Sequence, residues 1–198
     1  MIDEKVLGRM ANAGFTMYKD RIPGIESFIE SFRPNQIKCK SWLVEEIANT
    51  GMNYNNVLVL GSWNSLLLYE LMAASCDVNH YTFVDINDDV HLHRDIYFDV
   101  NAMDKNYVSM TCRVDEISDF ADYDLIINTS CEHMEPIPPV HGPLYALQSN
   151  DYKSIPEHTH CVKSAKQLQD QYGLDNDFYT GKKDMGHYNR FMVIGYHW

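Results

Sequence analysis

The sequence predicts a single α/β domain built on a mostly parallel sheet. Short apolar runs, of the kind that a buried parallel strand needs, occur at residues 57–60, 81–84 and 124–128. Segments with helical periodicity separate them, and this alternation indicates parallel strands joined by right-handed crossovers. Near the C-terminus, residues 177–180 and 190–196 are strand-like runs joined by a polar, glycine-containing connection. They predict an antiparallel hairpin that closes the sheet.

The other elements complete this pattern. Residues 65–72, directly after the first strand, have a helical period and composition, and residues 162–172 predict a second helix of this kind. Residues 107–112 and 144–148 are two further candidate strands. With the hairpin, the sheet is therefore expected to have seven strands.

The length and the N-terminal pattern predict one domain. A chain of 198 residues suits a single core. Its first part, residues 1–50, is helical in pattern and precedes the first strand, so it forms a lead-in to a core at residues 51–198. We therefore treat residues 1–198 as one domain.

Charge and cysteine content narrow the classes of partner. The formal net charge is -12, from 28 acidic and 16 basic side chains, and such a field repels a phosphate backbone. Neither nucleic acid nor an anionic membrane is expected as a partner. The five cysteines form no CxxC pair, no signal peptide is evident, and no apolar run approaches about 20 residues. We expect a cytoplasmic protein, and a homodimer is compatible with the sequence.

Polar residues at strand ends predict a ligand site. In parallel sheets the ligand lies at the carboxyl ends of the strands, where the strand order reverses. Gly61, Asp85 and Asn128 each fall at such an end, so they should converge. Gly61 permits a tight turn, and Asp85, 24 positions later, can accept the hydroxyl hydrogens of a ribose. The alternative is that Gly61 only ends a strand and Asp85 only caps the helix that begins near Asp88.

The order of these elements resembles the class I S-adenosylmethionine (SAM)-dependent methyltransferases over residues 50–198. The resemblance rests on Val57-Leu-Val-Leu-Gly61, Phe83-Val-Asp85, Tyr123-Asp-Leu-Ile-Ile-Asn128 and the C-terminal hairpin. It implies a Rossmann-like three-layer fold, with SAM as the cofactor and methyl transfer as the reaction.

The resemblance also implies which residues hold the cofactor. The turn after the first strand would face the methionine part, Asp85 the ribose, Ile86 the adenine ring and Asp115 the adenine amino group. The complete set of implied cofactor residues is Gly61, Ser62, Trp63, Asn64, Ser65, Asp85, Ile86, Asp115 and Asn128. The turn has fewer glycines than is usual in the family, so Trp63 either closes over the ligand or fills its space.

Two polar loops supply the candidate catalytic groups. The fourth strand runs into a loop with Glu132 and His133, either of which can take a proton from an acceptor as it is methylated. His160, in the polar segment 154–161, is the third candidate. We expect a small-molecule acceptor between the loops at residues 129–143 and 149–161.

Three other interpretations remain open. The chain could transfer the aminopropyl group of SAM, as nicotianamine synthase-like enzymes do, or Trp63 could block the crevice and leave a binding protein without activity. A metal-dependent enzyme is the third. Its ligands would come from the two histidine loops, namely Glu132, His133, Glu157, His158, His160 and Cys161. No spacing there matches a known metal signature, so no metal site is predicted, and His91 and His93 are interpreted as part of an exposed, acidic helix start.

Overall fold

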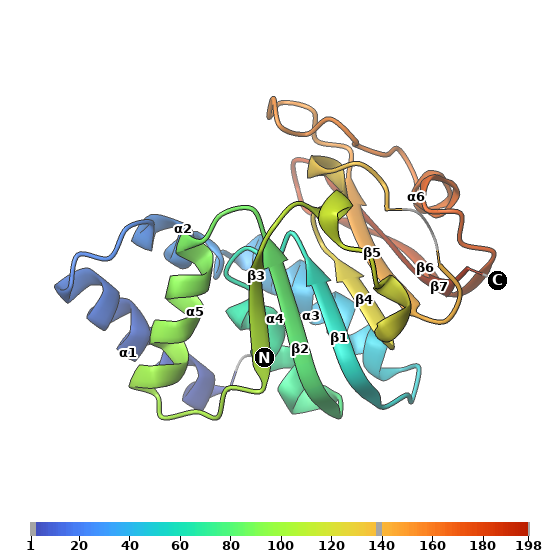
Figure 1. The fold of residues 1–198 in the computed structure, drawn as a ribbon. Helices are drawn as coiled ribbons and strands as arrows, with labels where there is room; N and C mark the ends of the chain where they lie inside the picture. The colour runs from blue at the N-terminus through green and yellow to red at the C-terminus, as the bar shows by residue number, and fades with distance from the viewer. Residues whose placement is uncertain (1–2, 138–139, 198) are drawn as a thin grey trace.

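A seven-stranded sheet forms the centre of the molecule (Figure 1). The computed structural model describes residues 3–137 and 140–197. The strand order is β3-β2-β1-β4-β5-β7-β6, and the order reverses between β1 and β4. The pairs among β1 to β5 are parallel, whereas β7 is antiparallel to both β5 and β6. The strands are β1 (Tyr54–Leu60), β2 (Val78–Asp85), β3 (Tyr107–Thr111), β4 (Leu125–Asn128), β5 (Leu144–Asn150), β6 (Asn176–Asp184) and β7 (Asn189–Tyr196). The predicted mostly parallel sheet with a C-terminal hairpin is confirmed.

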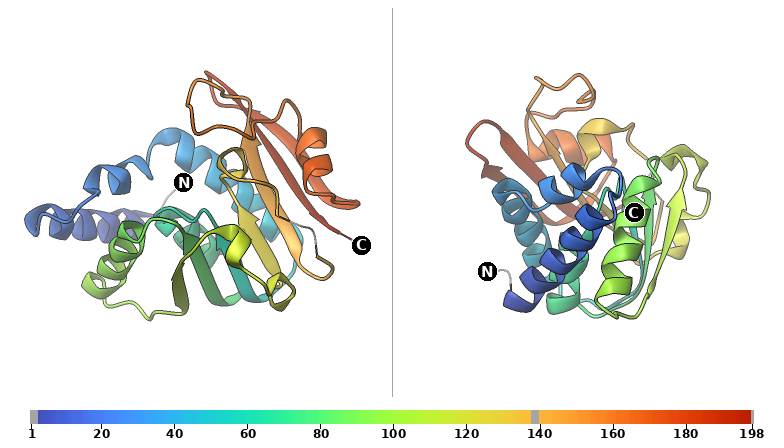
Figure 2. Two further views of the ribbon diagram at one scale, coloured as in Figure 1. Left: turned by 45° about the horizontal axis from the view of Figure 1, so that its top comes forward. Right: turned by 90° about the vertical axis from the view of Figure 1, so that its left-hand side faces the viewer.

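Helices cover the two faces of the sheet unequally (Figure 2). One face packs against the four longer helices, α1, α3, α4 and α5, and the other packs against α6 and short 3-10 turns. The helices are α1 (Glu4–Lys19), α2 (Ile25–Glu30), α3 (Pro34–Ala48), α4 (Leu66–Ser75), α5 (Asp89–Val100) and α6 (Ala165–Gln171). The 3-10 turns are η1 (Val114–Glu116), η2 (Phe120–Asp122) and η3 (Cys131–His133).

The apolar run in β1 explains why this strand lies at the centre. Successive side chains of a strand point to opposite faces. Val57 and Val59 belong to the core under the long helices, and Leu58 and Leu60 belong to the core on the other face. Each of these four side chains is almost completely buried, which stabilises the fold by about 1.5–3 kcal/mol per side chain.

A buried carboxylate fastens the N-terminal helix to the core. Glu70 of α4 is only 5% exposed, and it accepts hydrogen bonds from Arg9 of α1 (2.8 Å to Nε) and from the Tyr97 hydroxyl of α5 (2.5 Å). The amphipathic face of α1 packs against α5 beside this group. The lead-in is therefore held to the core by charge as well as by apolar contact.

Several predicted boundaries differ from the structure. The helix expected over residues 162–172 begins at Ala165, because the Ser164 side chain accepts a hydrogen bond from Gln167 N and caps it there. The interpretation of His91 and His93 as exposed is wrong, since they are only 8% and 0% exposed. The two prolines at positions 138 and 139, in the loop expected to border the acceptor, lie outside the described residues.

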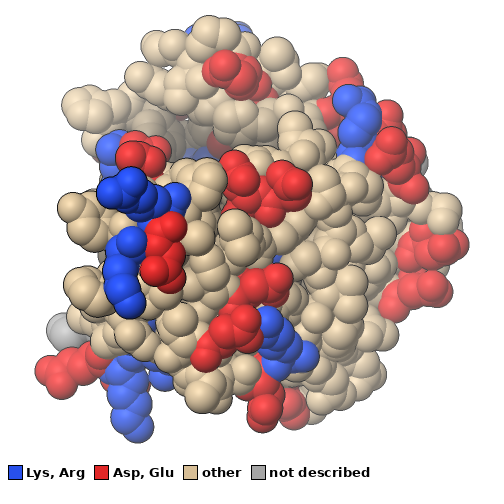
Figure 3. Space-filling model, turned by 60° about the vertical axis from the view of Figure 1, so that its left-hand side comes forward, with Lys and Arg blue, Asp and Glu red and all other residues tan. Residues whose placement is uncertain are grey.

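Two surface properties bear on partners. None of the helices in the described part of the chain is both long and apolar enough to cross a membrane. On the face drawn in Figure 3, Lys and Arg side chains alternate with Asp and Glu side chains and form no continuous basic area.

We predict that Arg9→Ala lowers the free energy of unfolding by about 1–3 kcal/mol, because Glu70 then remains buried without its cationic partner. Arg33→Ala is the matched control, since Arg33 pairs with Glu30 at the surface, with side chains 69% and 48% exposed. This control should lose less than about 1 kcal/mol. Urea unfolding measures both, and equal losses would contradict the structural role of Glu70.

Candidate functional site

The turn after β1 adopts an unusual backbone conformation. Gly61, Trp63 and Ser65 all have positive φ values, 52°, 47° and 45°. Glycine takes this conformation freely, but each of the other two residues costs about 1–3 kcal/mol there. Such a turn persists only where its surroundings hold it in place.

A buried arginine and an aspartate hold this turn. Arg94 of α5 is fully buried and donates from Nη2 to the Trp63 carbonyl (3.1 Å) and to Ser62 Oγ (3.2 Å). Its guanidinium lies 4.0 Å from the centre of the Phe83 ring. Burial lowers the pKa of Arg94 to about 10, so the group keeps its charge at neutral pH. From β2, Asp85 Oδ2 accepts a hydrogen bond from Trp63 N at 2.8 Å.

Three of the predicted cofactor residues support the site from behind. Asn64 is fully buried, with its Oδ1 atom 2.8 Å from Nδ1 of His93, whose Nε2 atom lies 2.6 Å from the Pro23 carbonyl. Ser65 is also buried and contacts the Ser62 carbonyl. Asn128 accepts a hydrogen bond from Ser130 N at 2.8 Å and so shapes the loop after β4. The structure places none of Asn64, Ser65 and Asn128 in the cavity wall.

A cavity of about 1210 Å³ opens at the carboxyl ends of β1, β2 and β4. This volume exceeds the range of about 300–1,000 Å³ that is common for small-molecule sites, so a cofactor and an acceptor can share it. The other predicted site residues line it, namely Gly61, Ser62, Trp63, Asp85, Ile86, Asp115, Glu132, His133 and His160. The structure brings Gly61 and Asp85 together at this cavity as predicted, whereas Asn128, predicted to converge with them, does not line it.

Trp63 belongs to the wall of this cavity. Its Nε1 atom donates a hydrogen bond of 2.5 Å to Ser27 Oγ in α2, and Lys40 Nζ lies 5.8 Å from the ring centre. The indole is thus held against the N-terminal helices. The open volume lies beside it, so Trp63 does not fill the cavity.

The side of the cavity that the sequence predicts for the cofactor combines acidic and apolar groups. Asp85 Oδ1 accepts a hydrogen bond from Asn87 N at 3.0 Å, which orients the carboxylate. Ile86 follows it in the cavity wall and is 75% exposed. Asp115 is paired with Arg113 (2.9 Å to Nε), and this hydrogen bond holds the pKa of Asp115 below its usual range.

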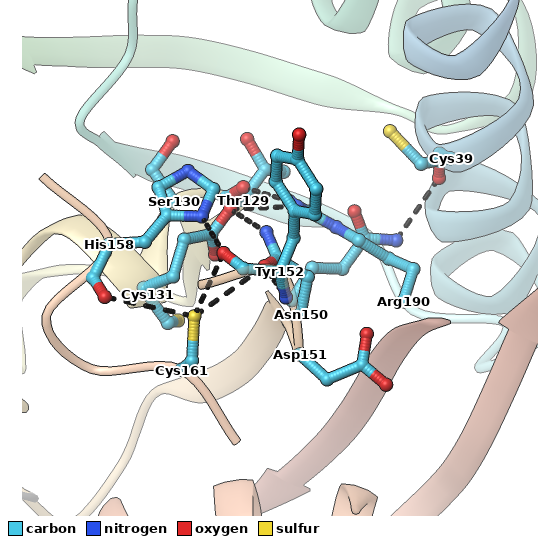
Figure 4. A network of polar contacts seen from close by, with 12 residues as sticks. Cys39, Thr129, Ser130, Cys131, Asn150, Asp151, Tyr152, His158, Cys161 and Arg190 are labelled. Atoms are coloured by element: carbon cyan, nitrogen blue, oxygen red, sulfur yellow. Dashed lines mark hydrogen bonds and ion pairs between the residues drawn. The ribbon is translucent and has the colours of Figure 1, made fainter. Parts of the chain in front are cut away.

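The opposite wall contains a buried ion pair. Glu132 is 3% exposed, and its Oε1 atom accepts hydrogen bonds from Asn150 Nδ2 (2.6 Å) and Arg190 Nη1 (2.8 Å). Arg190, from β7, also donates to the Thr129 carbonyl (Figure 4). Among the described residues, Glu132 Oε2 has no hydrogen-bond partner. Two hydrogen bonds to one oxygen therefore fix the position of the Glu132 side chain.

Two histidines lie next to Glu132. The rings of His133 and His158 make an edge-to-face contact with centres 4.5 Å apart. One oxygen of Glu132 and one nitrogen of each ring all lie within 4.8 Å of one another. His160 is directed elsewhere, with Nε2 3.1 Å from Glu135 and Nδ1 2.8 Å from Thr159 Oγ1.

Cys161 does not join that group of three. Its thiol donates to the Tyr152 carbonyl (3.3 Å, Figure 4), and burial raises the pKa of the Cys161 thiol, so it stays protonated. Glu157 is also outside the group. Of the potential ligands that the sequence suggested, the structure brings together only Glu132, His133 and His158 within the described residues.

Sequence reasoning missed four residues that build the site. Lys40, Arg94, Asn150 and Arg190 are all nearly or fully buried. For Arg190 a signal existed, because a charged residue starts an apolar strand run, Arg190-Phe-Met-Val-Ile. Arg94 and Lys40 lie in helices with other charged residues, where they look like ordinary surface positions.

Solved structures of methyltransferases share this fold. N-methyltransferase NodS from Bradyrhizobium japonicum WM9, in complex with S-adenosyl-L-homocysteine, has a TM-score of 0.65 at 10% identity and covers 93% of this chain and 97% of its own. Magnesium protoporphyrin IX methyltransferase from Synechocystis PCC 6803, with bound S-adenosyl-L-homocysteine, has a TM-score of 0.62 at 14% identity and covers 99% and 100%. No protein-family model and no curated protein matches the sequence. The chain therefore shares the fold of these two solved methyltransferases.

We predict that Arg94→Met lowers the free energy of unfolding by about 3 kcal/mol, because the left-handed turn loses the donor to Ser62 and Trp63. Arg113→Met is the control, since its ion pair with Asp115 is exposed and should contribute less than about 1 kcal/mol. Urea unfolding of the three proteins gives the comparison. A loss for Arg94→Met no larger than that of the control would show that the turn does not depend on the guanidinium.

Proposed function

We propose that this protein transfers the methyl group of SAM to a small-molecule acceptor. The observation that carries the proposal is the cavity, which joins the turn after β1 and Asp85 on one side to a polar wall on the other. Fold alone does not fix a function. The argument therefore rests on whether the residues of this chain suit the cofactor.

The cofactor side suits a nucleoside with a charged tail. Asp85 uses one oxygen for Trp63 N and the other for Asn87 N, and each oxygen keeps a lone pair for a ribose hydroxyl. The exposed Ile86 side chain offers an apolar surface to the adenine ring, and Asp115 an acceptor to its amino group. Gly61 has no Cβ, and the space that a Cβ would take lies 2.6 Å from the methyl group of Met134, so this flexible side chain would move aside when the methionine part approaches the backbone of the turn.

Lys40 is the group we assign to the carboxylate of the methionine part. It lines the cavity next to Trp63, and its Nζ atom lies 2.5 Å from Gln36 Oε1. Burial lowers the pKa of Lys40, which means that the isolated cation is costly in this position. A carboxylate in the cavity would offset that cost, because an opposite charge stabilises the ammonium.

SAM supplies an electrophilic methyl group on a sulfonium. The acceptor's lone pair forms the new bond to carbon, the carbon–sulfur bond breaks with its electron pair left on sulfur, and the acceptor's proton passes to a basic side chain of the cavity wall or to water. The chain contributes mainly position, because it holds the two reactants in one cavity. Glu132, His133 and His160 are the groups proposed to face the acceptor.

Aminopropyl transfer would use the same cofactor site. The two reactions differ in their products, since methyl transfer leaves S-adenosylhomocysteine and aminopropyl transfer leaves methylthioadenosine. Trp63 motivates another alternative, a binding protein without activity. The hydrogen bond from Trp63 to Ser27 and the open volume beside the indole favour a cavity that can accept the cofactor.

Asp85→Ala tests the ribose contact. We expect the wild type to bind SAM with a micromolar dissociation constant and the variant to bind at least about tenfold more weakly, because hydrogen bonds to a charged group contribute about 1.5–3 kcal/mol. Asp88→Ala, an exposed aspartate three positions later, should leave the affinity unchanged. Calorimetry measures binding, and circular dichroism verifies folding. No detectable binding by the folded wild type would refute the proposed function.

Lys40→Met tests the assignment of the cofactor carboxylate. The variant keeps the apolar length of the side chain but removes the charge, so we expect SAM affinity to fall by about tenfold without loss of stability. Lys38→Met in the same helix is the control, because Lys38 contacts the Asp184 carbonyl at the surface. Calorimetry and urea unfolding give the two readouts. Unchanged affinity in Lys40→Met would remove Lys40 from the cofactor site.

A further inference from the structure

We propose that Glu132, His133 and His158 bind a divalent first-row transition-metal ion in the wall of the cavity. One carboxylate oxygen and two imidazole nitrogens come within 4.8 Å of one another. A carboxylate and two histidines form a ligand set that suits Zn²⁺ and Fe²⁺, and imidazole ligands disfavour Mg²⁺ and Ca²⁺. The three residues come from two loops, one after β4 and one after β5.

The orphaned oxygen of Glu132 gives independent support. Arg190 and Asn150 both bind Oε1, which leaves Oε2 without a hydrogen-bond partner among the described residues, although Glu132 is only 3% exposed. A buried carboxylate oxygen without a partner costs about 1–3 kcal/mol or more. A metal ion would satisfy it. Arg190 and Asn150 would then act as the outer-shell partners that fix the orientation of a ligating carboxylate.

The hydrogen bond of His158 determines which of its nitrogens is available. Its Nδ1 atom lies 2.5 Å from the Tyr152 carbonyl, which can only accept, so Nδ1 carries the proton (Figure 4). In the neutral ring, Nε2 then holds the free lone pair. A histidine that donates its other N–H to a backbone carbonyl is the arrangement that metal-binding histidines usually have.

His133 completes the set from the open side of the cavity. Neither of its ring nitrogens has a hydrogen-bond partner among the residues that the structure describes. Its side chain is exposed to the cavity, which gives an ion from solvent a path to the buried carboxylate.

Three protein ligands leave a tetrahedral ion one open position toward the cavity. There, an oxygen or nitrogen of the acceptor could bind. This use of the ion rests on the proposed methyl transfer, whereas metal binding itself does not. In this assignment, Glu132 and His133 are metal ligands. This role replaces the one that the sequence suggested for them, which was to take a proton from the acceptor.

The test measures metal binding by the full chain after treatment with a chelator. Co²⁺ and Zn²⁺ are titrated by calorimetry, and the Co²⁺ complex is followed by its visible absorption. We expect wild type to bind one ion per chain. His133→Gln and His158→Gln should each weaken binding by more than about 100-fold, which exceeds the loss of about 10–100-fold that outer-shell changes cause. His80→Gln, near the amino end of β2 and far from the cavity, should bind like wild type.

SAM calorimetry on the same variants keeps the two proposals apart. Both histidine variants should bind SAM like wild type, because neither residue lies on the cofactor side. His133 is exposed and His158 is a half-buried loop residue, so folding should survive both substitutions, and circular dichroism verifies it. No binding of Co²⁺ or Zn²⁺ by folded wild type would overturn the metal site. Binding that His133→Gln and His158→Gln leave unchanged would overturn it equally.

Discussion

The arrangement of the cavity depends on one buried cation, the guanidinium of Arg94. It reaches from α5 to the turn after β1 and donates to the Trp63 carbonyl and Ser62 Oγ, while Ser109 Oγ in β3 takes another of its hydrogens. This group stabilises a turn in which non-glycine residues hold positive φ values. Trp63 belongs to this turn, and its backbone N–H donates a hydrogen bond to Asp85. The positions of Trp63 and Asp85, on the side of the cavity proposed for the cofactor, therefore depend on the contacts that Arg94 makes behind the turn.

Most of the sheet and part of this site could be predicted from local sequence. The strand ends at Gly61 and Asp85 were identifiable because a buried parallel strand is a short apolar run, and its end is marked by the first residue that needs water or a turn. Those two residues come together for topological reasons alone. Asn64 and Asn128 also lie at or just after the end of an apolar strand run, yet their side chains point into the protein. The apolar pattern shows where a strand ends, but it does not show which way the side chains beyond that end point.

The supporting polar groups could not be predicted, and the reason is physical. Arg94 and Ser62 are 32 positions apart, and Arg190 and Glu132 are 58 apart. A charged residue in a helix is usually solvated, so nothing local distinguishes Arg94 from its exposed neighbours. His91 and His93 were misread in the same way, because Asp88 and Asp89 indicate a surface helix start. Only the packing of α5 against the first turn shows that this polar face is internal.

The two walls of the cavity carry different buried polar groups. On one side, the buried amine of Lys40 lines the cavity, and its hydrogen-bond partner is the neutral side chain of Gln36. On the other side, Glu132 forms an ion pair with Arg190 through one oxygen, and its other oxygen has no hydrogen-bond partner among the described residues. Replacing a buried ion pair by apolar residues often costs nothing in stability. A buried amine with only a neutral partner and a buried carboxylate oxygen without a donor are therefore better explained by ligands than by the needs of folding, which agrees with the carboxylate proposed for Lys40 and the metal ion proposed for Glu132.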